Sequence, residues 1–188
     1  MSKMKVGLLT LAMLSVLGAG GAAAGGDELR RTVSINDRIP TASEVQEALF
    51  PKAIADQKTE CAKLEKAGLR CQSVIPKSSL DSVQVTFARG SARLTDEAKV
   101  FLRSVGEALK AKESEWTLLT VEGHADATGS DAVNRRLSKE RADSVKQFFA
   151  SSYGLKNIET VGRGSDKLKD PEDSGGAVNR RIEFIPDW

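Results

Sequence analysis

The chain has 188 residues, and its 28 lysine and arginine residues nearly balance 26 aspartate and glutamate residues, which leaves a formal charge of +2. This balance argues against a broad basic surface for duplex nucleic acid, and an aromatic content of 5% argues against stacking on single strands. One histidine and two cysteines disfavour a multi-histidine zinc centre and a histidine-based catalytic triad. Length and a hydrophobic content of 40% fit one folded domain with a small extension.

Residues 1–24 have the pattern of a secretory signal peptide. Lys3 and Lys5 precede an apolar run over residues 6–17, and a small-residue segment that includes Ala24 follows. Cleavage after Ala24 sends the mature chain to an oxidising compartment. The alternative is an uncleaved membrane anchor, although the apolar stretch barely reaches the ~20 residues that a spanning helix needs.

Residues 25–80 are expected to form a periplasmic arm and linker with short helices. Residues 27–40 are polar and show no sustained period. Thr41 and Glu44 have the spacing of a capping box, which predicts a short helix that Pro51 ends. Residues 76–79 have the composition of a linker.

The two cysteines lie in or next to a second predicted helix of the arm, over residues 53–67. Cys61 and Cys71 are ten positions apart, and in an exported chain such a pair predicts a structural disulfide. Two small buried hydrophobic residues are the alternative.

Residues 81–188 are predicted to be an α/β (α+β) sandwich in the order β-α-β-α-β-β, with two long helices packed on one mixed four-stranded sheet. The predicted strands are 83–88, 116–121, 158–162 and 181–185, and the helices start after Thr95 and span 132–150.

The candidate chemistry lies where the second strand meets the second helix. Asp126 follows the strand end, a common ligand position in open α/β sheets. Asn134 and Arg141 are seven residues apart and so share one face of the helix. Because arginine pairs with carboxylates and aspartate accepts from ammonium groups, the pair suits a zwitterionic ligand. Simpler interpretations are a capping role for Asp126, a surface ion pair for Arg141 with Glu140 or Asp143, or a structural Asp126–Arg141 salt bridge.

Four ordered motifs resemble the OmpA-like C-terminal domain family, which binds bacterial peptidoglycan. They are a strand and turn around Phe87 and Gly90; Gly123, His124, Asp126 and Gly129; Asn134, Leu137, Ser138, Arg141 and Ala142; and Asn179, Arg180 and Arg181. The resemblance covers residues 83–186. It departs from the family at Ala125, where threonine is usual, and at Val133, where an aromatic residue is usual.

The resemblance implies that Asp126 holds the ammonium and Arg141 the carboxylate of diaminopimelate in the peptidoglycan stem peptide. Asn134, Thr128, Leu137 and Arg180 match positions that line or brace the pocket in relatives. Of the adjacent arginines 180 and 181, at most one is expected to face the pocket.

The resulting hypothesis is a non-catalytic periplasmic protein that links the envelope to the wall, located at the cell wall or outer membrane. Its partners are the stem peptide and, through the arm, an outer-membrane or other envelope protein. Alternatives are an inner-membrane-anchored component of a stator or secretion assembly and, less favoured, a peptidoglycan hydrolase. No catalytic residue, cofactor or metal is expected, and His124 is interpreted as bracing a turn.

Overall fold

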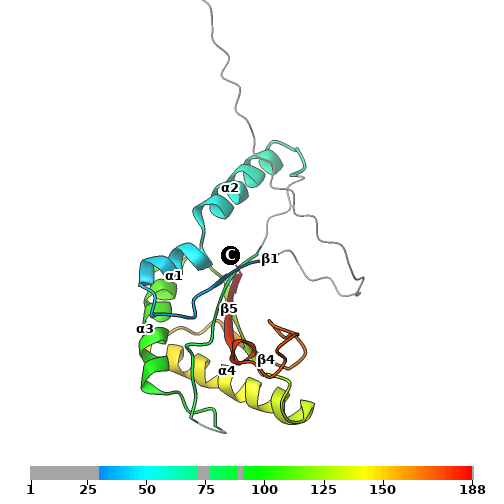
Figure 1. The fold of residues 1–188 in the computed structure, drawn as a ribbon. Coiled ribbons are helices and arrows are strands. Elements are labelled where there is room, and N and C mark those ends of the chain that lie inside the picture. The colour runs from blue at the N-terminus through cyan, green and yellow to red at the C-terminus, as the bar shows by residue number, and fades with distance from the viewer. Residues whose placement is uncertain (1–29, 72–76, 89–90, 188) are drawn as a thin grey trace, which may run out of the picture.

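The computed structural model describes residues 30–71, 77–88 and 91–187 (Figure 1). The expected signal peptide and Gly90 lie outside this part. The elements are β1 (Arg30–Ser34), α1 (Ala42–Leu49), α2 (Lys52–Lys66), β2 (Lys77–Ser82), α3 (Asp96–Ala111), β3 (Leu118–His124), α4 (Asp131–Tyr153), β4 (Ile158–Gly164), the short 3₁₀ helix η1 (Ala177–Asn179) and β5 (Ile182–Asp187).

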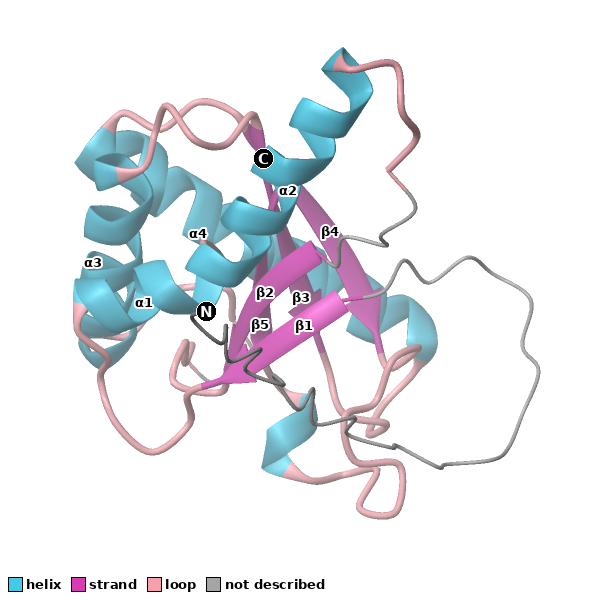
Figure 2. Ribbon diagram, turned by 90° about the horizontal axis from the view of Figure 1, so that it is seen from above, coloured by secondary structure: helices cyan, strands magenta, loops and turns pink. Residues whose placement is uncertain are grey.

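The strands form one mixed sheet in the order β1-β2-β5-β3-β4. β5 runs antiparallel to both of its neighbours, whereas β1 is parallel to β2 and β3 is parallel to β4. Helices α1, α3 and α4 lie on one side of this sheet (Figure 2). The predicted mixed α/β fold class is therefore confirmed, with five strands in place of the four expected.

Local capping signals explain where the helices begin. Thr41 and Glu44 form the predicted capping box of α1, and the Thr95 side chain accepts a hydrogen bond from the Ala98 amide at the start of α3. Ser130 caps α4 in the same way. Each cap satisfies an amide that the helix itself leaves unpaired, so these starts are encoded within a few residues.

Two glycines let α4 lie directly on the sheet. A Cβ atom at Gly123 of β3 would lie 2.1 Å from the carbonyl oxygen of Ser138, and one at Gly162 of β4 would lie 2.5 Å from that of Arg135. No real side chain tolerates such distances, so glycine sets the separation of helix and sheet. This separation in turn positions Arg141 above the end of β3.

The prediction that residues 83–88 form the first strand of the domain is wrong. The sheet uses residues 77–82, whereas residues 83–88 are irregular apart from an isolated bridge between Phe87 and Leu94. The polar strand is stable in the interior because its side chains are hydrogen-bonded; Ser79, for example, donates to the Glu183 carboxylate at 2.7 Å. The apolar alternation at 83–88 reflects packing of Val85 and Phe87 against the core.

The expected division between arm and domain at residue 80 also differs from the structure. β1 pairs with β2, and Ile35, Val45, Leu49 and Phe50 belong to the same hydrophobic core as the helices α3 and α4. A parallel edge strand is held by backbone hydrogen bonds, so its polar sequence gave no periodic signal. Residues 30–50 are consequently part of the domain.

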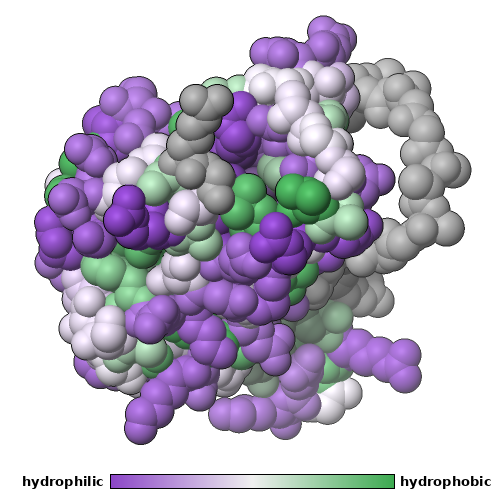
Figure 3. All heavy atoms as spheres, turned by 90° about the horizontal axis from the view of Figure 1, so that it is seen from below, coloured by the Kyte–Doolittle hydropathy of each residue, from purple (hydrophilic) through white to green (hydrophobic). Residues whose placement is uncertain are grey.

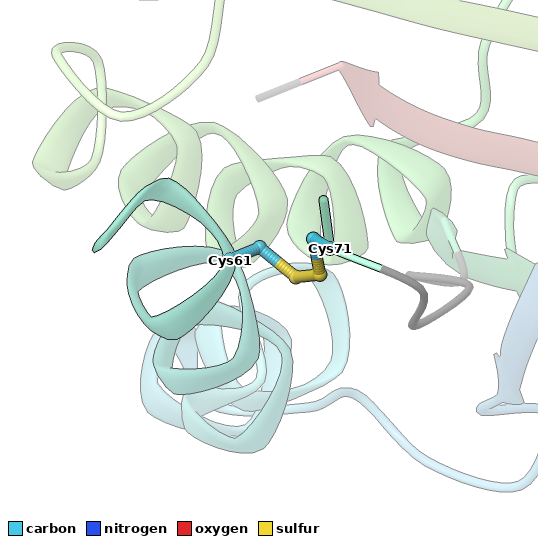
Figure 4. Close-up of a disulfide and its surroundings, with 2 residues drawn as sticks. All are labelled: Cys61 and Cys71. Atoms are coloured by element: carbon cyan, nitrogen blue, oxygen red, sulfur yellow. A yellow bond between two sulfur atoms is a disulfide. The ribbon is translucent and has the colours of Figure 1, made fainter. Parts of the chain in front are cut away.

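Helix α2 is the part of the former arm that does stand away from the body of the molecule (Figure 1). Its buried residues are Ile54 and Cys61. Cys61 is bridged to Cys71, with a Cα–Cα distance of 5.1 Å (Figure 4), which confirms the predicted disulfide.

Across residues 30–71, 77–88 and 91–187, no helix combines the length and the apolar character needed to cross a membrane.

Candidate ligand-binding site

A cavity of about 250 Å³ opens beside the end of β3. Its wall comes from the segment before α3, from α4 and from the η1–β5 junction, and includes Val85, Phe87, His124, Arg141, Arg180 and Arg181. Seen from below, the surface of the molecule is mainly hydrophilic, with hydrophobic residues exposed among the hydrophilic ones (Figure 3). The cavity lining combines apolar residues with arginines, a composition that suits a small polar ligand.

Asp126 lies two residues beyond β3 and is held in place by hydrogen bonds. The Thr128 amide donates to its Oδ1 at 2.9 Å, the Thr128 hydroxyl donates to the same oxygen, and Arg180 Nη1 donates to Oδ2 at 2.7 Å. Burial alone would raise the pKa of Asp126, but the bonds from Thr128 and Arg180 outweigh it and lower the pKa below its ordinary value. Asp126 is therefore an ionised carboxylate at neutral pH.

Asn134 braces the loop that carries Asp126. Its side-chain amide donates to the carbonyl oxygens of Asp126 at 3.1 Å and of Thr128 at 3.0 Å. Gly129, at φ 88°, allows the loop to turn back toward α4. The structure thus gives Asn134 and Thr128 supporting contacts to Asp126.

Arg141 presents its guanidinium group to the cavity. The group lies 5.0 Å from the centroid of the Phe87 ring, and its Nε donates to the Ser91 carbonyl at 3.3 Å. Among the described residues, no carboxylate lies within ion-pair distance of it. Burial lowers the pKa of Arg141, as does the nearby charge of Arg180, but arginine remains protonated at any ordinary pH.

Two simpler interpretations of Arg141 are thereby excluded. Glu140 pairs with Arg136 at 2.7 Å and Asp143 pairs with Lys139 at 2.5 Å, so neither is the partner of Arg141. The interpretation of Asp126 and Arg141 as a structural salt bridge is also wrong, because the two side chains form no ion pair with each other.

Asp126 instead pairs with Arg180, which lies 54 residues away in the sequence. Arg180 and Arg181 both line the cavity, but their guanidinium groups diverge, that of Arg180 to Asp126 and that of Arg181 toward Asp81, at 3.4 Å. Both residues precede β5, which begins at Ile182. The Arg181 guanidinium group donates to the Lys167 carbonyl oxygen at 3.3 Å.

Two further residues named in the sequence analysis, Leu137 and Val133, lie on α4. Leu137 is partly buried on α4 but is not among the described residues that line the cavity. Val133, one of the two expected departures from the family pattern, is 48% exposed. The structure therefore brings Asp126, Thr128, Asn134 and Arg180 together, places Arg141 on the cavity wall, and leaves Leu137 aside.

The sequence reasoning missed a buried polar cluster on the face of the sheet opposite α4. His124, which was expected to brace a turn, is the fully buried last residue of β3, and its ring nitrogens make no hydrogen bond to the described residues. Glu122 and Glu183 lie beside it and are both buried. A signal existed in the alternation of Glu122 and His124 along one strand, but only the strand order brings Glu183 opposite them.

A mixed sheet with helices on one side and a charged cavity beyond a strand end defines a small ligand-binding domain of the α+β class. The sequence matches the model of the OmpA family over residues 86–181, and the chain belongs to this family. The resemblance expected from the motifs is confirmed.

Named relatives extend this finding. The chain is 37% identical over 108 residues to outer membrane protein P5 of Haemophilus influenzae, which covers 51% of this chain and 30% of that protein. It is 30% identical over 105 residues to outer membrane porin F of Pseudomonas aeruginosa, covering 54% and 29%. The chain thus spans less than a third of the length of these relatives. Their names agree with the predicted location in the periplasm at the wall or outer membrane.

One solved structure supports the fold beyond the matched region. The putative MotB-like protein from Desulfovibrio vulgaris superimposes with a TM-score of 0.52 at 20% identity, covering 76% of this chain and 98% of that one. At this identity, the likeness concerns the fold alone.

Proposed function

We propose that this chain is a non-catalytic peptidoglycan-binding protein of the cell envelope, and that its cavity holds the zwitterionic end of diaminopimelate in the stem peptide. Membership of the OmpA family supports the proposal, as does the similarity to outer membrane proteins. By this binding the protein links the envelope to the wall.

The single observation that carries the proposal is the unpaired guanidinium group of Arg141. A half-buried cation with no carboxylate within ion-pair distance among the described residues loses hydration without a compensating charge. A ligand carboxylate restores that charge, and the planar guanidinium group receives it with two parallel hydrogen bonds. Stacking on Phe87 fixes the plane of the group before the ligand arrives.

Asp126 supplies the opposite charge. Its Oδ1 is occupied by Thr128, whereas among the described residues Arg180, a side chain that is 47% exposed, is the one partner of its Oδ2. An incoming ammonium group shares or replaces this one contact. Arg180 is then free to contact a second ligand oxygen, which accounts for its place on the cavity wall.

Titration of a diaminopimelate-containing stem peptide into the wild type and variants tests the assignment. Because charge-assisted hydrogen bonds contribute about 1.5–3 kcal/mol each, Asp126→Ala and Arg141→Ala should weaken binding roughly 10- to 150-fold. Arg141→Lys should be nearly as weak, since lysine lacks the planar fork. Arg136→Ala, which removes an exposed arginine from the same helix, is the matched control and should bind normally.

Two further measurements complete this experiment. The double variant should lose less than the sum of the single losses, because both residues hold one small ligand. An amidated diaminopimelate should bind poorly because Arg141 then has no carboxylate to receive. Full-strength binding by a folded Asp126→Ala variant would place the site elsewhere.

Absence of catalysis is tested separately. Purified sacculi incubated with the protein should keep their turbidity while the protein sediments with them. Loss of turbidity would favour a hydrolase.

A further inference from the structure

We propose that Glu122, His124 and Glu183 form a binding site for a divalent transition-metal cation, for which Zn²⁺ is the suitable probe. One oxygen or nitrogen atom from each of these buried side chains lies within 4.8 Å of the other two. Its ligands differ from the residues assigned above to peptidoglycan, although His124 lines the same cavity.

The register of the sheet places two like charges directly opposite each other. Glu122 of β3 is the cross-strand partner of Glu183 of β5, and both are almost fully buried. Carboxylates in this arrangement repel each other, so the fold requires positive charge nearby. His124 lies two residues after Glu122 and therefore points to the same face.

Both carboxylates already have hydrogen-bond partners. Arg30 and Ser79 donate to Glu183 Oε1 at 3.1 and 2.7 Å, whereas Arg163 donates to both oxygens of Glu122, from Nη2 to Oε1 and from Nε to Oε2 at 2.9 Å. Nε2 of His124 lies 3.6 Å from Glu183 Oε2 and 3.8 Å from Glu122 Oε2, the oxygen that Arg163 Nε also contacts. Hydrogen-bonded carboxylates held in this way are typical of ligands oriented by an outer shell.

The imidazole makes no hydrogen bond. Both ring nitrogens are buried, and neither has a hydrogen-bond partner among the described residues, although two carboxylates lie within ion-pair distance of Nε2. The distances of 3.6 and 3.8 Å exceed those of a hydrogen bond but lie close to the edge of a zinc tetrahedron. With metal–ligand bonds of about 2.0–2.2 Å, such an edge measures roughly 3.3–3.5 Å. Binding an ion requires the three ligand atoms, which lie within 4.8 Å of one another, to draw together to this edge length.

The donor set and its access define the class of ion. One imidazole with two carboxylates suits zinc and similar borderline cations better than magnesium or calcium, which prefer oxygen ligands only. His124 lines the 250 Å³ cavity, so an ion has an entry path and an open fourth position on that side. Because Arg30, Arg163 and the neighbouring Arg181 offset part of the negative charge, we expect micromolar affinity and not that of a closed structural site.

The test uses the full-length chain without a tag, dialysed against a chelator and then titrated with Zn²⁺, Mg²⁺ or Ca²⁺. Since the chain has one histidine, ¹⁵N-labelled histidine gives the signals of His124 alone. We expect one Zn²⁺ per chain and a shift of the Nε2 resonance that saturates with it, with no shift from Mg²⁺ or Ca²⁺. An imidazole spectrum that does not change with Zn²⁺ would overturn the proposal, even if exposed carboxylates bind the ion.

Variants then assign the ligands. Glu183→Gln and His124→Gln should each weaken zinc binding at least tenfold, whereas Glu159→Gln, which changes an exposed residue on β4, should leave it unchanged. Zinc binding by a folded Glu183→Gln variant at wild-type strength would contradict the assignment. If a variant does not fold, the wild-type resonance decides, and no peptidoglycan is needed in either measurement.

Discussion

Single residues set the geometry of the site, and Gly123 shows how little room there is. Its missing side chain lets α4 approach β3 so closely that a methyl group would meet the Ser138 carbonyl oxygen at 2.1 Å. The helix carries both Asn134 and Arg141, so the glycine determines where these two side chains lie relative to Asp126.

Gly123→Ala should therefore destabilise the protein by at least the ~1–3 kcal/mol typical of an overpacked interior, because the opposing atom belongs to the backbone. Gly175→Ala is the matched control, since the nearest atom there lies at an ordinary 3.7 Å. Urea unfolding followed by circular dichroism measures both. Equal stability of the two variants would show that α4 shifts without cost.

The ionisation of Asp126 predicts how binding depends on pH. Burial opposes its ionisation, but the hydrogen bonds from Thr128 and Arg180 prevail, and the pKa lies below the ordinary 3.8. The charged form thus predominates above that value and is lost as the pH falls through the lowered pKa. Sacculus binding should stay constant from pH 7 to 5 and decline only below 3.8.

Asp126→Asn is the control for this pH profile. It should bind weakly throughout and show a smaller decline in acid. A decline of the wild type already between pH 7 and 5 would mean that a different group governs binding.

At the scale of elements, the helices α1 and α2 differ although they follow each other in the chain. α1 buries Val45, Ala48 and Leu49 in the core, whereas α2 buries only Ile54 and Cys61 over its 15 residues. Helix α1 is therefore part of the domain core, whereas α2 packs against the domain with few buried side chains.

Leu49→Ala should accordingly cost ~2–5 kcal/mol of unfolding free energy, the usual range for a buried leucine. Leu64→Ala, at a position that is 40% exposed on α2, should cost less than ~1 kcal/mol. Thermal and urea unfolding distinguish them. A neutral Leu49→Ala would restore the idea that this segment is an arm outside the core.

The disulfide ties Cys61 of α2 to Cys71, which follows that helix in the chain. Closing a loop of this length stabilises by ~2.5–3 kcal/mol in the chain-entropy model. Replacing Cys61 and Cys71 by serine should therefore loosen α2, seen as faster amide exchange, while sacculus binding stays within twofold of the wild type. A large loss of binding would instead connect α2 to the cavity.

At the scale of the whole molecule, distant segments meet on the face of the sheet opposite α4. Lys169, from the β4–β5 connection, donates to Asp81 of β2 at 2.7 Å and to Ser34 of β1 at 2.5 Å. Arg30 of β1 reaches Glu183 of β5. The N-terminal strand is thus tied to the connection that carries Arg180.

How the protein is held in the envelope depends on residues 1–24, outside the described part. We propose cleavage after Ala24, which gives a mature chain that begins near Gly25 or Gly26. Intact-mass measurement of protein from the native envelope checks this proposal. A mass of 20.2 kDa in the membrane fraction would indicate a retained anchor, as the stator or secretion alternative requires.

The sequence by itself determined the features that depend on near neighbours. Helix starts at Thr41, Thr95 and Ser130 follow from hydrogen bonds that span three residues, and the Cys61–Cys71 bridge closes a short loop. The family motifs also placed Asp126 and Arg141 at one end of the sheet.

The tertiary structure decided which charges meet. Arg180 as the partner of Asp126, Glu183 opposite Glu122, and β1 beside β2 all depend on strand order and on burial. Charge interactions and backbone pairing act between segments that are far apart in the chain, so no local pattern encodes them. Local hydrogen bonds and periodicity determined the elements, and long-range pairing determined the site.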